Sequence, residues 1–233
     1  MRSRPPLLGA GRLRLIVGYA MSSGVRPRNR SISTISSTST TSGREPEFAL
    51  VERGVFGSLA LHGGNVLELC CGDGFNAKHF YSLRSRQVLA CDFDPGAIAH
   101  ARRTNAAPNV TYVVADIRKD IPDDIFENVA WDGAIEHFTP DEIALILVSI
   151  KQRLRPTGIL SGYTIVERPT GKSLHHYEYE FKSKEDLATV LRPHFARVTV
   201  FETIYPDRHN LYSWASDGPV PFDPDWSQSR RQG

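Results

Sequence analysis

The chain has 233 residues, of which 40% are hydrophobic and 23% are charged, and its formal net charge at pH 7 is +2. A chain of this length and composition can bury one substantial core, so we expect one folded domain. The small net charge gives no general case for binding to nucleic acid or to a membrane surface. No run of about 18 apolar residues is present, so we expect no membrane-spanning helix.

The first 44 residues differ in composition from the rest of the chain. They hold eight arginines and no acidic residue, and ten of the twelve residues from Ser31 to Ser42 are Ser or Thr. Because such a segment cannot bury enough apolar surface to order itself, we predict a disordered basic leader over residues 1–44. A transit peptide and a start at Met21 stay open as alternatives, so the expected location is cytoplasmic, or an organelle if the leader is a targeting signal.

From Glu45 onward, helical and strand patterns alternate along the chain. A helix is expected over residues 45–62, where it would form one wall of a cleft, and another over residues 73–83. Further helices are expected to begin at Pro95, after the capping box of Thr139 and Glu142, and at Ser183. The first expected strand begins at Val66. Further strands are expected over residues 88–91, 110–115, 128–131, 159–166, 198–204 and 211–215.

This order of elements predicts the fold class. Strands separated by helices imply a doubly wound α/β fold, with a mostly parallel sheet covered by helices on both faces. Residues 198–204 and 211–215 should close the sheet as an antiparallel pair. We therefore expect one domain over residues 45–216 and an irregular tail over residues 217–233.

A glycine turn follows the first strand, in the sequence Glu68-Leu69-Cys70-Cys71-Gly72-Asp73-Gly74. Glycines at this place let the backbone approach a ligand at the carboxyl end of a strand. Glu68 and Asp73 would repel a pyrophosphate, since two unit charges about 4 Å apart interact by roughly 4 kcal/mol at an effective dielectric near 20. The acidic turn therefore favours S-adenosylmethionine, which carries a sulfonium and an ammonium, over NAD, although Gly72, Gly74 and Ala77 also fit the dinucleotide fingerprint.

The next three strands also end in acidic residues, Asp92, Asp116 and Asp132. Parallel strands end at one edge of a sheet, so these carboxylates should meet where ligands bind. Asp92 follows Gly74 by 18 residues, a spacing at which an acid can bind both hydroxyls of a ribose. Asp116 could accept from the exocyclic amine of adenine. Phe93 and Ile117 are available as apolar walls for the ring. Each acid taken alone could equally be a turn residue.

These residues resemble the class I S-adenosylmethionine-dependent methyltransferases, and more narrowly the type 11 methyltransferase domains. The segment Ile135-Glu136-His137-Phe138 matches the Glu-His segment that follows the fourth strand in that family, and the resemblance covers about residues 45–216. It implies a Rossmann-like sheet of seven strands with an antiparallel strand near the C-terminus. One departure is visible, because Cys70 stands where the family usually has its first glycine.

The resemblance also implies a role for each residue of the cofactor site. Glu68, Cys70, Gly72 and Gly74 would line the methionine end. Asp92 would bind the ribose, and Asp116 with Ile117 would frame the adenine.

The acceptor side of the site is predicted from two segments. If the acceptor is a hydroxyl, His137 is the candidate base, Glu136 could orient it or face the acceptor, and Asp132 could touch either substrate. His137 could instead merely pack near the helix that follows. Substrate contacts are expected from the segment 167–181, which includes His175, His176 and Tyr177. No metal site is expected, because neither the paired histidines nor the cysteines at 70, 71 and 91 have ligand spacing.

The function that these features favour is methyl transfer from S-adenosylmethionine to a small molecule, at a hydroxyl oxygen. Two alternatives stay open, a nucleic-acid methyltransferase and a cofactor-binding partner subunit without catalysis. Against the first, the fourth strand lacks the Asn/Asp-Pro-Pro-aromatic turn of amine-directed DNA methylases, and the folded part shows no basic face. The oligomeric state is not predicted.

Overall fold

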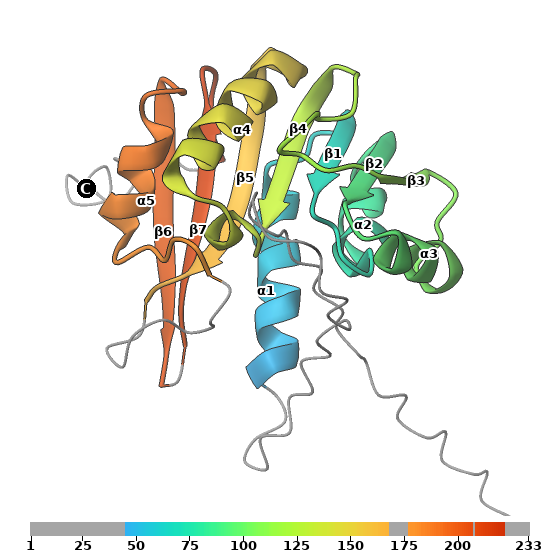
Figure 1. Cartoon of the computed structure of the whole chain (residues 1–233), viewed down its shortest axis with the longest axis horizontal. Coiled ribbons are helices and arrows are strands. Elements are labelled where there is room, and N and C mark those ends of the chain that lie inside the picture. Colours follow the sequence, from blue (N-terminus) through green and yellow to red (C-terminus); the bar gives the residue numbers. More distant parts are fainter. Residues whose placement is uncertain (1–44, 168–176, 207, 222–233) are drawn as a thin grey trace, which may run out of the picture.

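The computed structural model describes residues 45–167, 177–206 and 208–221, and within this part seven strands form one sheet in the order β3-β2-β1-β4-β5-β7-β6 (Figure 1). The strands are β1 (Asn65–Leu69), β2 (Gln87–Asp92), β3 (Val110–Val114), β4 (Phe126–Asp132), β5 (Leu154–Ile165), β6 (Arg197–Tyr205) and β7 (Arg208–Ser216). The helices are α1 (Glu45–Leu59), α2 (Phe75–His79), α3 (Pro95–Thr104), α4 (Pro140–Arg153) and α5 (Lys184–Leu191), with 3-10 turns at Tyr81–Leu83 and Ile135–His137.

The sheet is mostly parallel, as predicted. Strands β1 to β5 pair in parallel, while β7 runs antiparallel to both β5 and β6. Because side chains alternate across each strand, two apolar clusters form on opposite faces. Leu67 and Leu69 pack in the cluster that holds α4 and α5, whereas Val66 packs with α2 and α3 in the other. The doubly wound α/β architecture with an antiparallel strand near the C-terminus is confirmed.

Local capping signals in the sequence place three helix starts correctly. The Oδ1 atom of Asp94 accepts from the amide of Gly96 at 2.7 Å, at the start of α3. Thr139 and Glu142 form the reciprocal capping box of α4. Ser183 caps α5 by accepting from the amide of Asp186. These bonds satisfy amides that have no partner within the helix, which is why the starts can be predicted from short sequences.

The helix predicted over residues 73–83 is wrong in its extent. Helix α2 ends at His79, and Phe80 leaves the helical conformation before a separate 3-10 turn. The Phe80 ring packs against Gly54 of α1, where a Cβ would lie 2.3 Å from a ring carbon. Tyr81 is fully buried. These tertiary contacts, rather than local propensity, set the end of α2.

The start of β5 also differs from its prediction. The sequence predicts a strand that begins at residue 159, but β5 begins at Leu154, directly after α4 ends at Arg153, and it includes Pro156. The pairing with β4 is irregular here, since Phe126 pairs with Leu154 and Asn128 with Ile159. A bulge of this kind accommodates a proline, which cannot donate to the ladder.

Gly74 is required by its conformation and by its neighbour. Its φ is +76°, and an added Cβ would lie 2.5 Å from the ring of Tyr112. Gly63 has φ +83°, but an added Cβ there would have no heavy atom within 4 Å. Substitution of Gly63 therefore measures only the free-energy cost of the left-handed conformation.

We expect Gly74→Ala to lower the free energy of unfolding more than Gly63→Ala does. Alanine at either position must adopt the left-handed conformation, at about 1–2 kcal/mol. Gly74→Ala also overpacks the Tyr112 ring, at about 1–3 kcal/mol more. Urea unfolding of both variants measures the difference. Equal losses would show that the Tyr112 contact does not constrain the turn.

Candidate active site

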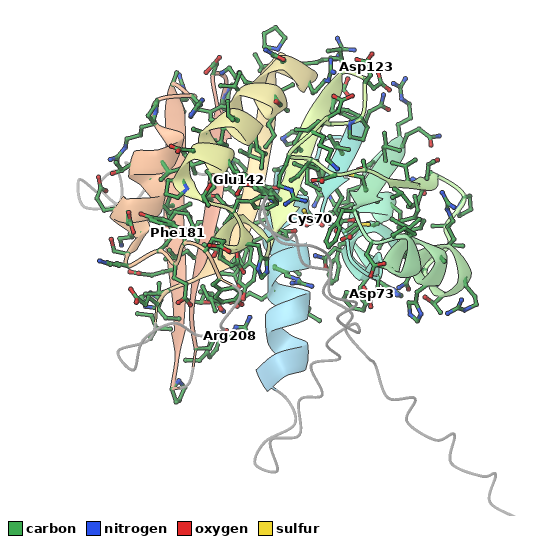
Figure 2. The ribbon with its side chains drawn as sticks, viewed as in Figure 1. Cys70, Asp73, Asp123, Glu142, Phe181 and Arg208 are labelled. Atoms are coloured by element: carbon green, nitrogen blue, oxygen red, sulfur yellow. The ribbon has the colours of Figure 1, made fainter. Side chains whose placement is uncertain are left out.

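The acidic residues predicted at the strand ends lie along one edge of the sheet. In the parallel ladders, Leu69 of β1 aligns with Cys91 of β2 and with Trp131 of β4. Cys91 in turn aligns with Val113 of β3. The four strands therefore end together, and the residues that follow them lie at one edge of the sheet; Figure 2 labels two of these residues, Cys70 and Asp73, in the turn after β1.

The turn after β1 is built from left-handed backbone. Cys70 has φ +54°, Gly72 has +55° and Gly74 has +76°, and Cys70 is the non-glycine residue with positive φ in the described part of the chain. At the position where the sequence departs from the resembled family, cysteine therefore adopts the left-handed conformation that glycine adopts most readily. Such a conformation costs a non-glycine residue of the order of 1–2 kcal/mol.

Asp92 holds this turn in place. Its Oδ2 accepts from the amide of Gly72 at 3.0 Å, and its Oδ1 accepts from the amide of Asp94 at 2.9 Å. Burial raises the pKa of Asp92, and these two bonds oppose the increase. Each oxygen keeps lone pairs with which it can accept from a further donor.

Asp116, at the end of β3, is already paired with a cation. Arg118 Nε donates to Oδ1 at 2.8 Å, and Arg118 Nη2 donates to Oδ2 at 2.8 Å. The hydrogen bonds from Arg118 hold the pKa of Asp116 below its ordinary value. Ile117 is 5% exposed and packs in the core, while Phe93 is half-buried. An adenine amine would therefore share Asp116 with Arg118, which sequence reasoning missed although it lies two residues further on.

Glu68 lies at the centre of the acidic edge. Its side chain is 3% exposed, and its Oε2 has no hydrogen-bond partner among the described residues. Burial raises the pKa of Glu68 well above its ordinary value, and the nearby Asp132 raises it further. Arg53 of α1 acts in the opposite direction on Glu68, and also on Asp73 and Asp132.

Arg53 is the second residue that sequence reasoning missed. Helix α1 was predicted as a wall of the cleft, but no charged residue on it was assigned a role. The signal was present, since Arg53 is the one Lys or Arg between Glu45 and Ala77. Its position opposite several carboxylates makes it the cation that offsets them.

Asp132 accepts a hydrogen bond from the hydroxyl of Tyr81. Burial raises the pKa of Asp132 to about 6, although hydrogen bonds from Tyr81 and Asn76 and the charge of Arg53 lower it. This carboxyl group therefore becomes protonated when the pH falls below about 6.

Glu136 and His137 occupy the 3-10 turn after β4, and both side chains are buried. Thr164 Oγ1 donates to Glu136 Oε2 at 3.0 Å, and burial raises the pKa of Glu136 to about 7. The carbonyl of Glu136 accepts from the amides of Glu178 and Tyr179 at 2.9 and 3.2 Å. The end of the segment 167–181 is thus fastened to this turn.

Tyr177 lies against the candidate base. The rings of His137 and Tyr177 have centroids 4.9 Å apart in an edge-to-face arrangement. The structure therefore brings together two residues that the sequence assigned separately to catalysis and to substrate binding. The other predicted substrate contacts, His175 and His176, lie outside the described residues, as do the leader 1–44 and residues 222–233 of the tail.

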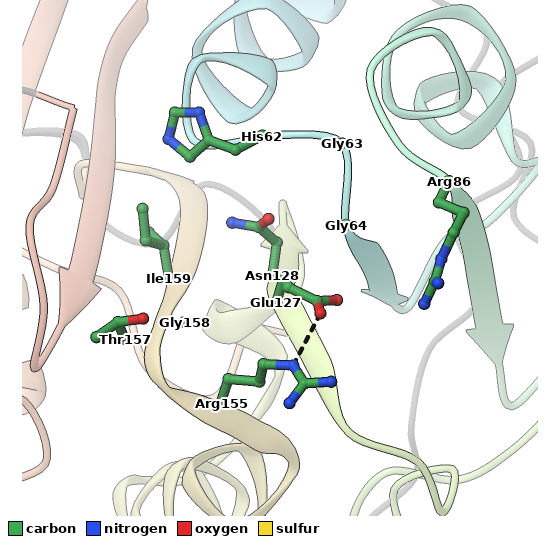
Figure 3. Close-up of a pocket in the computed structure, with 10 residues that line it drawn as sticks. All are labelled: His62, Gly63, Gly64, Arg86, Glu127, Asn128, Arg155, Thr157, Gly158 and Ile159. Carbon is green, nitrogen blue, oxygen red and sulfur yellow. Dashed lines mark hydrogen bonds and ion pairs between the residues drawn. The ribbon is translucent and has the colours of Figure 1, made fainter.

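A separate cavity of about 530 Å³ lies at the opposite edge of the sheet (Figure 3). Arg86, Arg155 and Glu127 line it, and Arg155 Nε donates to Glu127 Oε1 at 2.8 Å. The lining residues stand at the amino ends of β1, β2, β4 and β5, so the cavity is not part of the acidic edge. Within the described ranges, no group of three His, Cys, Asp or Glu side chains is placed to hold a metal ion, and no helix is long and apolar enough to cross a bilayer.

Comparisons with known proteins agree with this geometry. Residues 66–158 match the model of a family described as "Methyltransferase domain". The malonyl-[acyl-carrier protein] O-methyltransferase of Bacillus cytotoxicus is 28% identical over 123 residues, which are 52% of this chain and 42% of that protein. The chain thus spans less than half the length of this curated relative.

Two solved structures show the same fold. The DhpI–SAH complex has a TM-score of 0.61 at 22% identity, over 75% of this chain and 88% of that chain. The N-methyltransferase NodS from Bradyrhizobium japonicum, in complex with S-adenosylhomocysteine, has a TM-score of 0.58 at 16% identity, over 72% and 87% of the two chains. At these identities the likeness concerns the fold alone.

The matched domain, the sheet order and the acidic edge together define a methyltransferase with a Rossmann-like fold. More narrowly, residues 66–158 form a methyltransferase domain, which supports the resemblance to the class I S-adenosylmethionine-dependent methyltransferases inferred from the sequence and favours S-adenosylmethionine as the cofactor. The residues present fit this molecule, because an ammonium group would supply the donor that the buried Glu68 Oε2 lacks.

The raised pKa of Glu136 predicts how stability depends on pH. Between the ordinary value of 4.5 and the folded value of about 7, the folded state binds a proton that the unfolded state has lost. The free energy of unfolding should therefore fall as the pH rises through this window, by up to about 3 kcal/mol for Glu136, since one pKa unit corresponds to roughly 1.4 kcal/mol.

Glu136→Gln keeps a hydrogen-bond acceptor for Thr164 but removes the titrating carboxyl group. The free energy of unfolding of this variant should therefore fall less between pH 5 and pH 8 than that of the wild type. Urea unfolding at pH 5 and pH 8 compares the wild type with the variant, and Glu202→Gln serves as a control because the pKa of Glu202 is lowered by its partners. A wild-type pH dependence in Glu136→Gln would assign the effect to other groups.

Proposed function

We propose that this methyltransferase acts on a hydroxyl oxygen of a small-molecule acceptor. The observation that carries the proposal is the position of His137, which lies beside Tyr177 directly after the strand that ends in Asp132. An imidazole at this place can take a proton at the edge where the cofactor binds. The name of the Bacillus cytotoxicus relative, an O-methyltransferase, supports oxygen as the acceptor atom.

In this proposal the cofactor lies across the four strand ends. Asp92 binds the ribose hydroxyls with the lone pairs that its backbone bonds leave. Asp116 and Ile117 frame the adenine, with Phe93 as a further apolar wall. The turn formed by Cys70, Gly72 and Gly74 lines the methionine end, and Glu68 accepts from its ammonium group.

The bound cofactor supplies an activated methyl group, so the protein needs to align the acceptor and exclude water. The cofactor would supply the methyl group to the acceptor oxygen with its sulfur as the leaving group, and His137 would accept the hydroxyl proton. Glu136, held by Thr164, and Asp132 face the same region and set its charge. Tyr177 packs on His137 and limits the orientations of its ring.

Asp92→Ala should weaken the binding of S-adenosylhomocysteine by about 1–3 kcal/mol, the usual cost of losing charge-assisted hydrogen bonds. Isothermal titration calorimetry measures this. Asp94→Ala is the matched control, because it removes the cap of α3 and lowers stability without removing the ribose acceptor. Equal affinity of the Asp92 variant and the wild type would remove Asp92 from the ribose role.

His137→Ala should lower turnover by about 10²-fold or more while cofactor affinity stays unchanged, as expected for a general base. The assay is mass spectrometry for the gain of one methylene unit on candidate hydroxylated metabolites incubated with protein and S-adenosylmethionine. His209→Ala, on the β6–β7 hairpin, is the control. Near-wild-type turnover in His137→Ala would leave this residue a packing role.

Two other results would redirect the proposal. Methylation confined to added RNA or DNA would assign the enzyme to nucleic acid. Cofactor binding without methylation of any acceptor would favour a non-catalytic partner subunit.

A further inference from the structure

Two arginines from distant parts of the chain meet at one tyrosine. The Cζ of Arg53, in α1, lies 5.9 Å from the ring centroid of Tyr163, and the Cζ of Arg208, in β7, lies 5.8 Å from it. Arg208 Nη2 also donates to the Tyr163 hydroxyl. Tyr163 pairs with Asp132 across the β4–β5 ladder, so both guanidinium groups lie at the edge that carries the candidate active site.

Neither arginine has a carboxylate partner at salt-bridge distance among the described residues. The ionisable groups that act most strongly on Arg208 are the tyrosines at 163, 177 and 212. The Nε of Arg53 is buried without a hydrogen-bond partner in the described part of the chain. By contrast, Arg118 and Arg155 each pair with an acid.

The positive charges of both arginines act on the carboxyl group of Glu136, but Glu136 does not neutralise them fully. Arg53 and Arg208 each lower the pKa of Glu136, yet burial still raises it to about 7. Below that pH its carboxyl group is largely neutral. Arg53 acts also on Glu68, Asp73 and Asp132, but neither guanidinium group is paired with a carboxylate at salt-bridge distance in the described part of the chain.

A buried network aims both arginines at Tyr163. Glu52 is 8% exposed and accepts hydrogen bonds from four side chains of the β6–β7 hairpin, Thr203, Tyr205, Asn210 and Tyr212. Successive residues of a helix point about 100° apart, so fixing Glu52 also fixes the direction of Arg53. Asn210 Oδ1 accepts from Arg208 Nε at 2.8 Å, which joins the second arginine to the same network.

We propose that Arg53 and Arg208 form an anion-binding subsite that holds a carboxylate or phosphate group of the methyl acceptor. Guanidinium groups bind both kinds of anion through paired hydrogen bonds, and a pre-oriented pair at one aromatic ring is suited to this task. Tyr177 acts on Arg208 and packs on His137, so an anion held here would bring the rest of the acceptor to the proposed base. The inference rests on the proposed function for the identity of the bound molecule.

Arginine side-chain NMR on the full chain, saturated with S-adenosylhomocysteine, tests this subsite. Sodium malonate and sodium phosphate are titrated separately while the Nε–Hε signals of Arg53, Arg208 and Arg155 are followed. We expect saturable shifts at Arg53 and Arg208 with the preferred anion, and none at Arg155, which is paired with Glu127 at the opposite edge. The anion that saturates first distinguishes a carboxylate from a phosphate.

Substitutions make the test quantitative. Arg208→Ala and Arg53→Ala should each weaken anion binding about tenfold or more, the effect expected for a lost charge-assisted bond. Arg208→Lys keeps the positive charge and should retain part of the affinity for the anion. This variant controls for a loss of binding in Arg208→Ala that is caused by misfolding. Arg155→Ala should bind as the wild type does.

Two outcomes would overturn the proposal. The first is an absence of saturable shifts at both arginines. The second is anion binding that occurs in the free protein and is abolished by S-adenosylhomocysteine, which would assign the arginines to the cofactor. Failure of S-adenosylhomocysteine itself to bind, seen by calorimetry, would count against the proposed function, whereas the anion titration on the free protein would still test the subsite.

Discussion

The structure depends on gathering carboxylates at one buried edge without leaving their charge uncompensated. Parallel strands that end in register bring Glu68, Asp92 and Asp132 together whether or not their charges repel. Isolated buried charges are very unfavourable, so each of these groups needs donors, a cation or a proton. The molecule uses all three, and one oxygen of Glu68 has no hydrogen-bond donor among the described residues.

These means of compensation divide the site into two sides. On the cofactor side, backbone amides hold Asp92, and a proton can reside on Glu68 until a cationic group replaces it. On the proposed acceptor side, Arg53 and Arg208 bring positive charge to Tyr163. A methyl donor that carries positive charge and an acceptor that carries negative charge would each meet the opposite sign, which favours binding of both in one cleft.

Much of this site could be predicted from the sequence, because its signals are short-range. Glycines at 72 and 74, the acids that close successive strands, and the caps Asp94 and Thr139 each depend on a few neighbouring residues. The parallel topology then fixes where the acids meet. Even the departure at Cys70 was visible, and the left-handed backbone there shows why a glycine is usual.

The parts that could not be predicted depend on contacts between distant residues. Helix α2 stops early because Phe80 packs on Gly54 of another helix. The bulge at Pro156 is set by the register with β4. Arg53 and Arg208 come together at Tyr163 only because α1 packs against the β6–β7 hairpin. No neighbouring residue in the sequence indicates that either arginine lies at the site. Patterns of hydrophobicity locate elements, but they do not say which charged side chains will face each other.

The attachment of α1 through Glu52 has a consequence for how the protein is made. The side chains that bind Glu52 come between 151 and 160 residues later in the chain. At ribosomal rates of roughly 5–20 residues per second, the helix waits on the order of ten seconds for them. A nascent chain can assemble much of its parallel sheet during that time, but the wall that carries Arg53 is secured only when the last strand emerges. A product truncated before β7 would retain the acidic turn and lose the wall opposite it.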